Sequence, residues 1–249
     1  MTISVTNIGT GGNGSGSTVS VAVPAGGVPA GALIVGGYCE ANTNGFVASF
    51  GDSNSQTYNY WNDAGDLGGN AADGSFGGFY LDPANNTLGL TNGQSIIGTK
   101  GQSVPAAINA FYATGVANAP YDKKNGAHGS GTAASSGSSG TPTQANELVV
   151  GLVMSNPSAS SMGFSQASGG WLSLPGVATD GQATIQAATA GGYIVQTTAT
   201  AETYSPTIAS APWGCLISSF KAAAVSVFAG FTGFDSSEMG SLEPHMIGY

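Results

Sequence analysis

The residues of this sequence with the clearest potential for chemistry are five aspartates in its first half: Asp52, Asp63, Asp66, Asp73 and Asp82. Two carboxyls held roughly 5 to 10 Å apart could hydrolyse a glycosidic bond. The Asp52-x-Asn54-x-Gln56 spacing resembles a calcium loop, but it lacks the following glycine and the bidentate glutamate. The neighbouring asparagines, serines and glycines are typical of turns. We therefore predict turn residues, with a calcium site near Asp52–Asp66 and a catalytic acid pair as the less favoured alternatives.

Other catalytic and cofactor motifs are missing from the sequence. His128 and His245 have no nearby nucleophile, and two separate histidines do not make a zinc site. No Gly-x-Ser-x-Gly lies between a strand and a helix as in a hydrolase. The run Gly12-Asn-Gly-Ser-Gly16 lacks the lysine of a phosphate-binding loop. We expect no enzymatic activity, no cofactor and no metal.

A cluster of aromatic residues, Tyr58, Tyr60 and Trp61, alternates with Asn59 and Asn62. Aromatic rings beside amides can bind a sugar by stacking and hydrogen bonding. Aromatic residues are also frequent in strands, where they lie half in the core and half on the surface. The second interpretation is favoured, and a glycan contact at Tyr58, Tyr60 and Trp61 is the alternative.

Residues 223–249 differ in character from the rest of the chain. Phenylalanine recurs every third residue with glycine between, which suits an extended arm. We predict that this arm contacts a neighbouring subunit through Phe228, Phe231, Phe234, Met246 and Tyr249. The alternative is that it folds back over its own sheet edge, since an exposed apolar tail would favour aggregation.

The elements that must position these residues are strands. Thr18–Val23 alternates apolar and polar residues, and glycine interrupts nearly every segment that could form a helix. We predict an all-β, antiparallel, jelly-roll-like β-sandwich over residues 1–222, with almost no helix. Further strands are expected at Ala32–Cys39, Phe46–Phe50, Thr57–Trp61, Gly78–Leu81, Gln94–Gly98, Ala106–Thr114, Glu147–Ser155, Gln182–Ala187, Gly192–Thr197 and Trp213–Ala223.

The two halves of the sandwich contain similar segments in the same order, which suggests an internal repeat of 32–113 in 147–222. Ala32-Leu-Ile-Val-Gly36 resembles Glu147-Leu-Val-Val-Gly151, and Gly77-Gly-Phe-Tyr-Leu81 resembles Gly191-Gly-Tyr-Ile-Val195. The halves could form the two sheets of one sandwich, which we favour, or two tandem small sandwiches. Asn-Gly pairs, including Asn125-Gly126, predict turns. The Gly/Ser-rich segments 125–146 and 11–17 predict flexible surface chain.

The amino-acid composition restricts the kinds of partner that we expect this protein to bind. Charged residues make up 7% of the chain, all four positive charges are lysines, and the net charge is −9. Nucleic-acid binding and attraction to an anionic membrane both depend on basic residues, so we expect neither. No apolar run approaches a membrane span, and the N-terminus has no signal-peptide pattern. Cys39 and Cys215 both lie in apolar strands, and we favour buried free thiols over a disulfide.

Residues 1–222 resemble the β-sandwich modules of tailed-phage and prophage virion proteins and related bacterial surface proteins. The resemblance is carried by Val19-Ser-Val-Ala-Val-Pro24 followed by Ala32-Leu-Ile-Val-Gly36, by the step from Asp52 to Tyr58, and by Gly192-Tyr-Ile-Val195 followed by Trp213–Lys221. It implies no catalytic residues. It implies instead a structural protein on the virion surface, such as a capsid decoration, head fibre or tail-associated protein.

We therefore expect an extracellular, virion-located protein that forms homo-oligomers and contacts other virion structural proteins. The alternative is a secreted carbohydrate-binding module or adhesin that recognises surface glycans.

Overall fold

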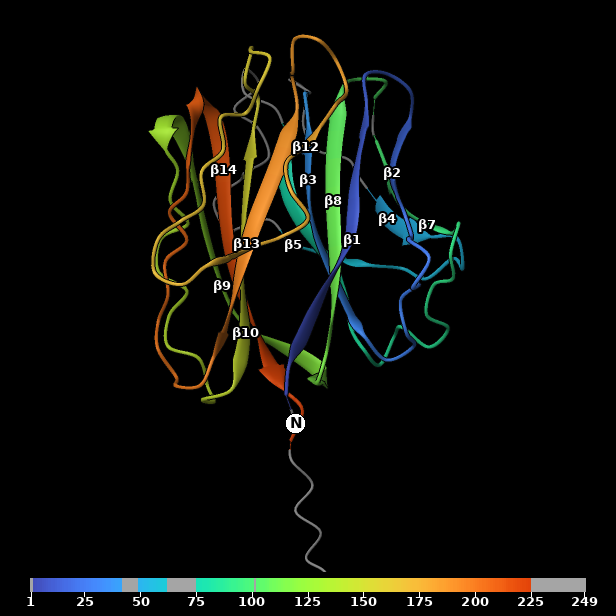
Figure 1. Ribbon diagram of the computed structural model, residues 1–249, viewed down its shortest axis with the longest axis vertical. Coiled ribbons are helices and arrows are strands. Elements are labelled where there is room, and N and C mark those ends of the chain that lie inside the picture. The colour runs from blue at the N-terminus through green and yellow to red at the C-terminus, as the bar shows by residue number, and fades with distance from the viewer. Residues whose placement is uncertain (1, 42–48, 62–74, 101, 225–249) are drawn as a thin grey trace, which may run out of the picture.

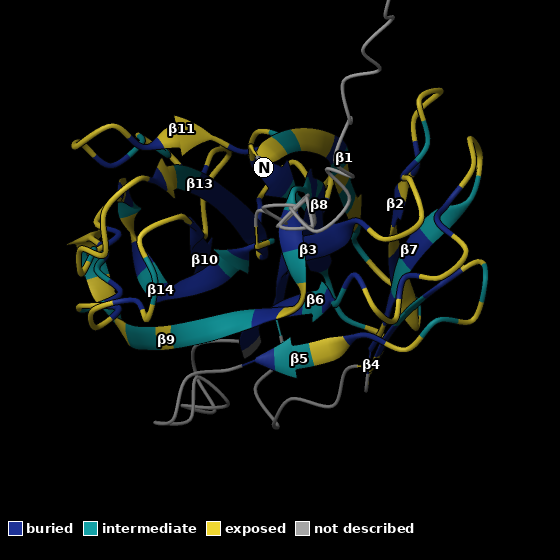
Figure 2. Cartoon of the chain, turned by 90° about the horizontal axis from the view of Figure 1, so that it is seen from below, coloured by how far each residue is buried: buried dark blue, intermediate teal, exposed yellow. Residues whose placement is uncertain are grey.

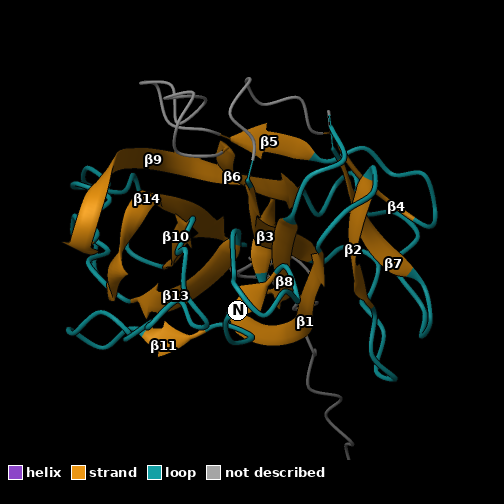
Figure 3. Cartoon of the chain, turned by 90° about the horizontal axis from the view of Figure 1, so that it is seen from above, coloured by secondary structure: helices purple, strands orange, loops and turns teal. Residues whose placement is uncertain are grey.

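The computed structural model describes residues 2–41, 49–61, 75–100 and 102–224, and within these ranges the chain contains strands and no helix (Figure 3). The strands are β1 (Ser4–Asn13), β2 (Thr18–Ala22), β3 (Leu33–Glu40), β4 (Ser49–Asp52), β5 (Asn59–Trp61), β6 (Ser75–Leu81), β7 (Ser95–Thr99), β8 (Ala106–Thr114), β9 (Val116–Ala133), β10 (Glu147–Ser155), β11 (Leu172–Ser173), β12 (Ala178–Thr179), β13 (Ala188–Gln196) and β14 (Thr207–Ala222). The prediction of an all-β sandwich is confirmed.

The strands form three sheets, and every strand pair is antiparallel. The five-stranded sheet has the order β1-β8-β3-β6-β5, and the three-stranded sheet has the order β2-β7-β4. The six-stranded sheet has the order β11-β13-β10-β14-β9, with β12 also paired to β13. Figure 1 shows the six-stranded sheet on the left, the five-stranded sheet in the middle and the small sheet on the right.

Three hydrophobic cores lie on the faces of these sheets, two of them between sheets and one on an outer face. The central core fills the space between the five- and six-stranded sheets, where Leu33, Val35 and Phe111 meet Leu148, Val150 and Phe220. A second core lies between the five-stranded sheet and the small sheet, and includes Val21, Tyr38, Phe79 and Ile96. The outer core lies on the far face of the six-stranded sheet, where loop residues such as Tyr204 cover Val149 and Ile217.

The alternation of side chains along a strand explains why two sheets are buried on both faces. In β10, Leu148 and Val150 point into the central core, whereas Val149 and Val153 point into the outer core. All nine residues of β10 are buried. Such strands are continuously apolar, which is why Ala32–Cys39 and Glu147–Ser155 could be recognised in the sequence.

The two halves of the chain separate cleanly between the sheets. Strands β1 to β8 build the five- and three-stranded sheets, and β9 to β14 build the six-stranded sheet. The repeat-related segments of β3 and β10 each lie at the centre of three strands, between β8 and β6 and between β13 and β14 respectively. The two halves therefore face each other across the central core as the sheets of one sandwich.

Three local predictions are wrong. The segment predicted as a flexible loop, 125–146, is strand through Ala133, and the Asn125-Gly126 pair lies inside β9 instead of forming a turn. The chain after β9 also packs on the protein, since Ser136 N donates to Tyr204 O at 2.9 Å and Ser139 N to Glu202 O at 2.8 Å.

The start of the second Gly-rich segment, 11–17, belongs to β1. The predicted strand at Gln182–Ala187 is loop, because Asp180 Oδ2 accepts hydrogen bonds from Gln186 N and Ala187 N.

Both cysteines are free and buried, as favoured from the sequence. They lie in different cores: Cys39 belongs to the central core and Cys215 to the outer core. The Cys39 thiol donates to Ser155 O and the Cys215 thiol to Tyr204 O. Burial raises the pKa of both thiols, so neither is readily ionised or oxidised.

Candidate functional site

Asp52 occupies the turn that the sequence predicts. Its carboxylate accepts hydrogen bonds from Asn54 N at 2.9 Å, Gln56 N at 3.1 Å and Gln56 Nε2 at 2.9 Å. The hydroxyl of buried Tyr58 donates to it at 3.0 Å. Both carboxylate oxygens are thus used in closing the turn between β4 and β5.

The other aspartates do not gather around Asp52 within the described structure. Asp82 accepts a hydrogen bond from Asn59 Nδ2 at 3.3 Å, and burial raises its pKa. Asp63, Asp66 and Asp73 lie outside the described residues, so the calcium and acid-pair alternatives stay untested there. Among the residues that are described, no three His, Cys, Asp or Glu side chains cluster as metal ligands would.

The proposed glycan residues do not form one exposed surface, and this corrects the glycan-contact alternative. Trp61 lies in the central core, where its ring is 5.5 Å from that of Tyr80, and Tyr58 lies in the second core. Tyr60 is half-buried, 5.8 Å from Phe50, and its hydroxyl donates to Phe76 O at 3.2 Å. Because successive side chains point to opposite faces of a strand, β5 sends neighbouring rings into different cores.

The predicted arm residues Phe228, Phe231, Phe234, Met246 and Tyr249 lie outside the described residues. The structure does locate where the sandwich ends. Ala222 N donates to Asn146 O at 3.0 Å and Ala223 N to Gly115 O at 2.9 Å. The chain is therefore tied to the sheet through Ala223.

The most distinctive surface element is the edge strand β9. It has 18 residues and pairs with β14 along one side only. In the described ranges, no other strand and no backbone–backbone hydrogen bond occupies its outer side between Asp122 and Ala133. Figure 2 shows β9 running along one rim of the molecule and mostly half-buried. We call this outer side, from Lys124 to Ser130, the β9 edge.

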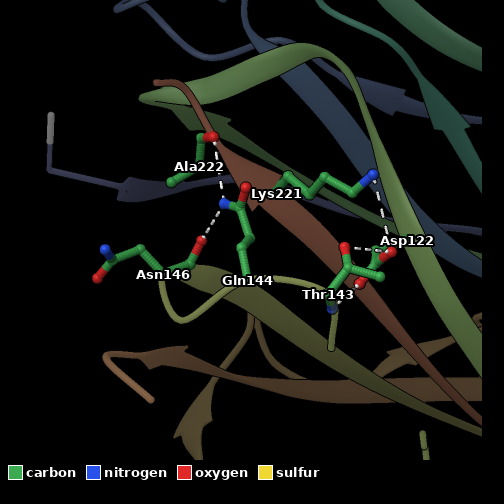
Figure 4. Close-up of polar contacts among 6 residues, drawn as sticks. All are labelled: Asp122, Thr143, Gln144, Asn146, Lys221 and Ala222. Atoms are coloured by element: carbon green, nitrogen blue, oxygen red, sulfur yellow. Dashed lines mark hydrogen bonds and ion pairs between the residues drawn. The ribbon is translucent and has the colours of Figure 1, made fainter. Parts of the chain in front are cut away.

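A polar cluster around Asp122 holds the first half of β9 against β14 and the loop before β10 (Figure 4). Asp122 accepts hydrogen bonds from Thr143 N at 2.6 Å and Thr143 Oγ1 at 2.9 Å. Lys221 Nζ lies 3.7 Å from Asp122 Oδ1. Beside this cluster, Gln144 Nε2 donates to Asn146 O at 2.7 Å and to Ala222 O at 3.3 Å. These contacts join β9, β14 and the loop before β10.

Glu147, at the start of β10, lies behind this cluster and is fully buried. Neither of its carboxyl oxygens has a well-formed hydrogen bond to the described residues, and its polar neighbours are the Ser219 hydroxyl, the Asp122 carboxyl and the main chain of Gln144. Burial raises the pKa of Glu147 to about 7, and the nearby Asp122 carboxylate adds to the rise while Ser219 opposes it. Although burial also opposes ionisation of Asp122, the hydrogen bonds from Thr143 and the charge of Lys221 lower its pKa.

Two carboxyls with oppositely shifted pKa values could serve in acid–base chemistry. The side chain of Asp122 is only 5% exposed and Glu147 is fully buried, so neither carboxyl is presented to a substrate. The contacts of Asp122 all join segments of the six-stranded sheet, so the arrangement serves to fix β9.

A shallow cleft of about 410 Å³ lies at one end of the five-stranded sheet. It is lined by uncharged residues of three segments: Ala25–Pro29, Leu90–Asn92 and Tyr112. Paired hydrogen bonds between Val28 and Leu90, at 2.7 and 2.8 Å, hold the two loops together. Tyr112, which is half-buried against the second core, and Asn92 both line this cleft and offer it the aromatic and amide groups that the sequence predicts at Tyr58–Trp61.

Neither the β9 edge nor the Tyr112 cleft is predicted from the sequence. Leu90–Asn92 gave only a turn signal, and β9 has the glycine, serine and asparagine content of a loop. A signal for β9 was present in its apolar start, Val116-Ala-Asn-Ala-Pro-Tyr121.

Comparisons with known proteins add no relative. No protein-family model, no curated protein and no solved structure matches the chain. In the described residues, no helix is long and apolar enough to cross a membrane.

Proposed function

We propose that this protein is a non-enzymatic structural protein of a bacteriophage virion surface, acting through subunit–subunit contacts as a capsid decoration, head fibre or tail-associated protein. The observation that carries the proposal is the β9 edge, a long strand side on which no other strand of the described residues pairs. Strand addition to such an edge gives affinity through main-chain hydrogen bonds.

The chemistry of the strand supports a contact instead of a protected edge. Monomeric proteins shield edge strands with charges, prolines or covering segments, because open edges promote aggregation. In β9 the charged residues and the proline lie in the first half, at Pro120, Asp122, Lys123 and Lys124. From Asn125 to Ala133 the strand is uncharged if His128 is neutral.

The low charge of the whole chain supports the same proposal. Burying a charged side chain in an interface costs several kcal/mol unless it is paired. With charged residues at 7% of the sequence, most of the surface can be buried against a neighbour without that cost. The predicted arm, 223–249, would add a second contact to a neighbouring subunit.

The virion location rests on the resemblance of residues 1–222 to phage β-sandwich modules, and it can be tested directly. The producing culture is separated on a density gradient, and each fraction is analysed by mass spectrometry. Co-banding of the protein with capsids, tails or filaments is the expected result. Recovery only as free protein would overturn the virion assignment.

A second candidate function is glycan binding at the Tyr112 cleft, favoured by a tyrosine ring in an uncharged lining. If this function holds, Tyr112→Ala abolishes binding on a glycan array and Tyr112→Phe retains stacking. Leu172→Ala, at a side chain that is 55% exposed on β11, is the control. Absence of any glycan binding by the unmodified protein would exclude this candidate.

A further inference from the structure

We propose that β9 pairs with β9 of a second copy of the chain, antiparallel and across a two-fold axis that passes beside Ala127. This inference deepens the proposed function, because it names the partner and register of the β9 edge. It joins two six-stranded sheets into one continuous sheet.

The direction of the main-chain groups of β9 follows from those of β14. Pro212 O accepts from Asn156 N, and Ala222 N donates to Asn146 O, so even-numbered residues of β14 face β10. Ala223 N donates to Gly115 O, so odd-numbered residues face β9. In an antiparallel ladder, residues alternate between bonding one neighbour and the other.

The register between β14 and β9 is regular from Ser219↔Lys123 to Ala211↔Gly131. Lys123, Asn125, Ala127 and Gly129 oppose the odd-numbered residues of β14 and therefore bond to it. Lys124, Gly126, His128 and Ser130 then direct their N–H and C=O groups outward. Gly126 agrees with this assignment, because its N–H donates to the Asn125 side chain at 2.9 Å instead of to β14. Pairing with a second copy replaces this bond by one between the two strands.

The outward residues are arranged symmetrically about Ala127. With the two-fold axis beside Ala127, Lys124 pairs with Ser130 of the second copy, and Gly126 pairs with His128 of the second copy. Each outward residue therefore meets an outward residue, as an antiparallel ladder requires. The regular edge ends beyond Ser130, where Gly131 has a φ of 114° and the register shifts.

The same register places the charges favourably. Lys123 faces Gly131 of the second copy and Lys124 faces Ser130, so no two lysines are directly opposite. Like charges directly opposite each other would destabilise the pair. The residues nearest the axis are small: Gly126, Ala127 and Gly129 let the two strands approach without side-chain clashes. An axis beside Ala127 also pairs the whole regular edge, from Lys124 to Ser130, with itself, as the two-fold symmetry of a dimer of identical chains requires.

Cysteine cross-linking tests the register. Ala127 would form a non-hydrogen-bonded pair with its own counterpart, with Cα atoms about 4.5 Å apart. That separation is within the range for a disulfide. Ala127→Cys is therefore expected to give a covalent dimer under mild oxidation. Because Cys215 of β14 lies directly opposite Ala127, both cysteine variants are made in a Cys215→Ala background, which prevents an intrachain disulfide, and Cys39 is buried in the central core.

Asn125→Cys is the matched control, because residue 125 would face residue 129 of the second copy and lie far from its own counterpart. A covalent dimer with Ala127→Cys and none with Asn125→Cys is the expected result. No dimer with Ala127→Cys, or equal dimer with both, overturns the proposal.

A proline substitution tests the hydrogen bonding of the edge. Ser130 lies opposite Pro212, and its N–H points outward, so Ser130→Pro removes no bond within the chain. By symmetry it removes two bonds between copies, which raises the dimer dissociation constant by about tenfold or more. Sedimentation of Ser130→Pro and Ser130→Ala is compared at several concentrations, with circular dichroism confirming the fold. Equal dimer stability of the two variants overturns the proposal.

The proposed function and this inference can fail separately. Co-banding with particles but no cross-link at Ala127→Cys would retain the virion assignment and exclude the β9 pairing. A cross-linked dimer that never bands with particles would retain the pairing and exclude the virion assignment.

Discussion

At the scale of single residues, Asp122 of β9 and Glu147 at the start of β10 are two neighbouring carboxyls whose surroundings separate their pKa values. Asp122 is held ionised by Thr143 and Lys221, whereas burial keeps Glu147 protonated up to about pH 7. A charged Glu147 would be buried away from water beside the Asp122 carboxylate, which costs free energy. The stability of the protein should therefore depend on pH through Glu147.

Glu147→Gln tests this dependence. The native pKa of about 7 lies above the ordinary 4.5, so the native state keeps a proton that the unfolded chain releases as pH rises between these values. The wild type therefore loses stability across this window, and the loss is complete above about pH 7. Because glutamine cannot ionise, the Glu147→Gln variant does not lose this stability as the pH rises. The stability of the variant relative to wild type should rise by about 1–3 kcal/mol between pH 5 and pH 8, measured by urea unfolding.

Asp122→Asn is the companion variant. It weakens the charge-assisted bonds from Thr143 and the ion pair with Lys221, and we expect a loss of about 1–3 kcal/mol. A relative stability of Glu147→Gln that is the same at both pH values would contradict the assignment of Glu147.

Trp61→Ala separates the two interpretations of the aromatic segment. The Trp61 side chain is 3% exposed and its ring lies 6.0 Å from that of Phe220, so truncation leaves a cavity in the central core. The expected loss is about 3–5 kcal/mol in urea unfolding. Leu172→Ala, at an exposed position, should change stability by less than about 0.5 kcal/mol. A fully stable Trp61→Ala protein would restore the surface interpretation.

At the scale of elements, the strands that could be predicted are those whose side chains enter a core. β3, β8 and β10 are predicted by their apolar runs, because each of these strands is buried on both faces. β1 and β9 lie at sheet edges, where main-chain pairing requires no particular side-chain pattern. Some of their glycines are required because neighbouring atoms pack too closely for a side chain, and the sequence alone does not show this. A Cβ on Gly11 would lie 1.8 Å from Ser20 O, and one on Gly129 would lie 2.8 Å from the Trp213 ring.

The error at Gln182–Ala187 has the opposite cause. The segment has the alternation of a strand, but Asp180 binds the backbone of residues 186 and 187 and holds the chain in a loop. Side-chain capping of this kind competes with sheet formation and depends on the tertiary position of the carboxylate.

Gly151→Ala tests the glycine at the centre of β10. A Cβ here would lie 2.1 Å from Cγ of the Tyr204 ring, which is buried in the outer core. Relief of this clash requires displacement of a packed ring, so we expect a loss of about 1–3 kcal/mol or more in urea unfolding. Gly26→Ala is the control, since its Cβ would meet nothing within 4 Å. Equal stability of the two variants would contradict this prediction, because it would mean that the outer core rearranges around the added methyl group at little cost in free energy.

At the scale of the whole molecule, the sandwich and its division into two facing halves could be predicted, but the candidate interaction site could not. The two-sheet arrangement follows from two similar apolar segments that each need burial. The β9 edge emerges only when β9 is paired with β14, because its outward groups depend on which residues of β14 face β10. The Tyr112 cleft likewise requires Leu90 and Val28, far apart in sequence, to pair.

The boundary of the sandwich gives a prediction for the whole chain. Because Ala223 N still bonds to Gly115 O, a chain ending at Ala224 keeps every hydrogen bond of the described sheets. We expect it to match the full chain in unfolding free energy within about 0.5 kcal/mol. The arm hypothesis further predicts that this truncated chain no longer joins higher assemblies, as measured by sedimentation and density gradients.

The β9 pairing makes the truncation more informative, because the two contacts are independent. Ala127→Cys in the truncated chain should still give a covalent dimer, since the β9 edge lies entirely within residues 124–130. The full chain with Phe228, Phe231 and Phe234 changed to serine is the control for length, and it should lose higher assembly as the truncation does. Normal assembly of the truncated chain would overturn the arm hypothesis, and would leave the β9 edge as the contact that has to explain assembly.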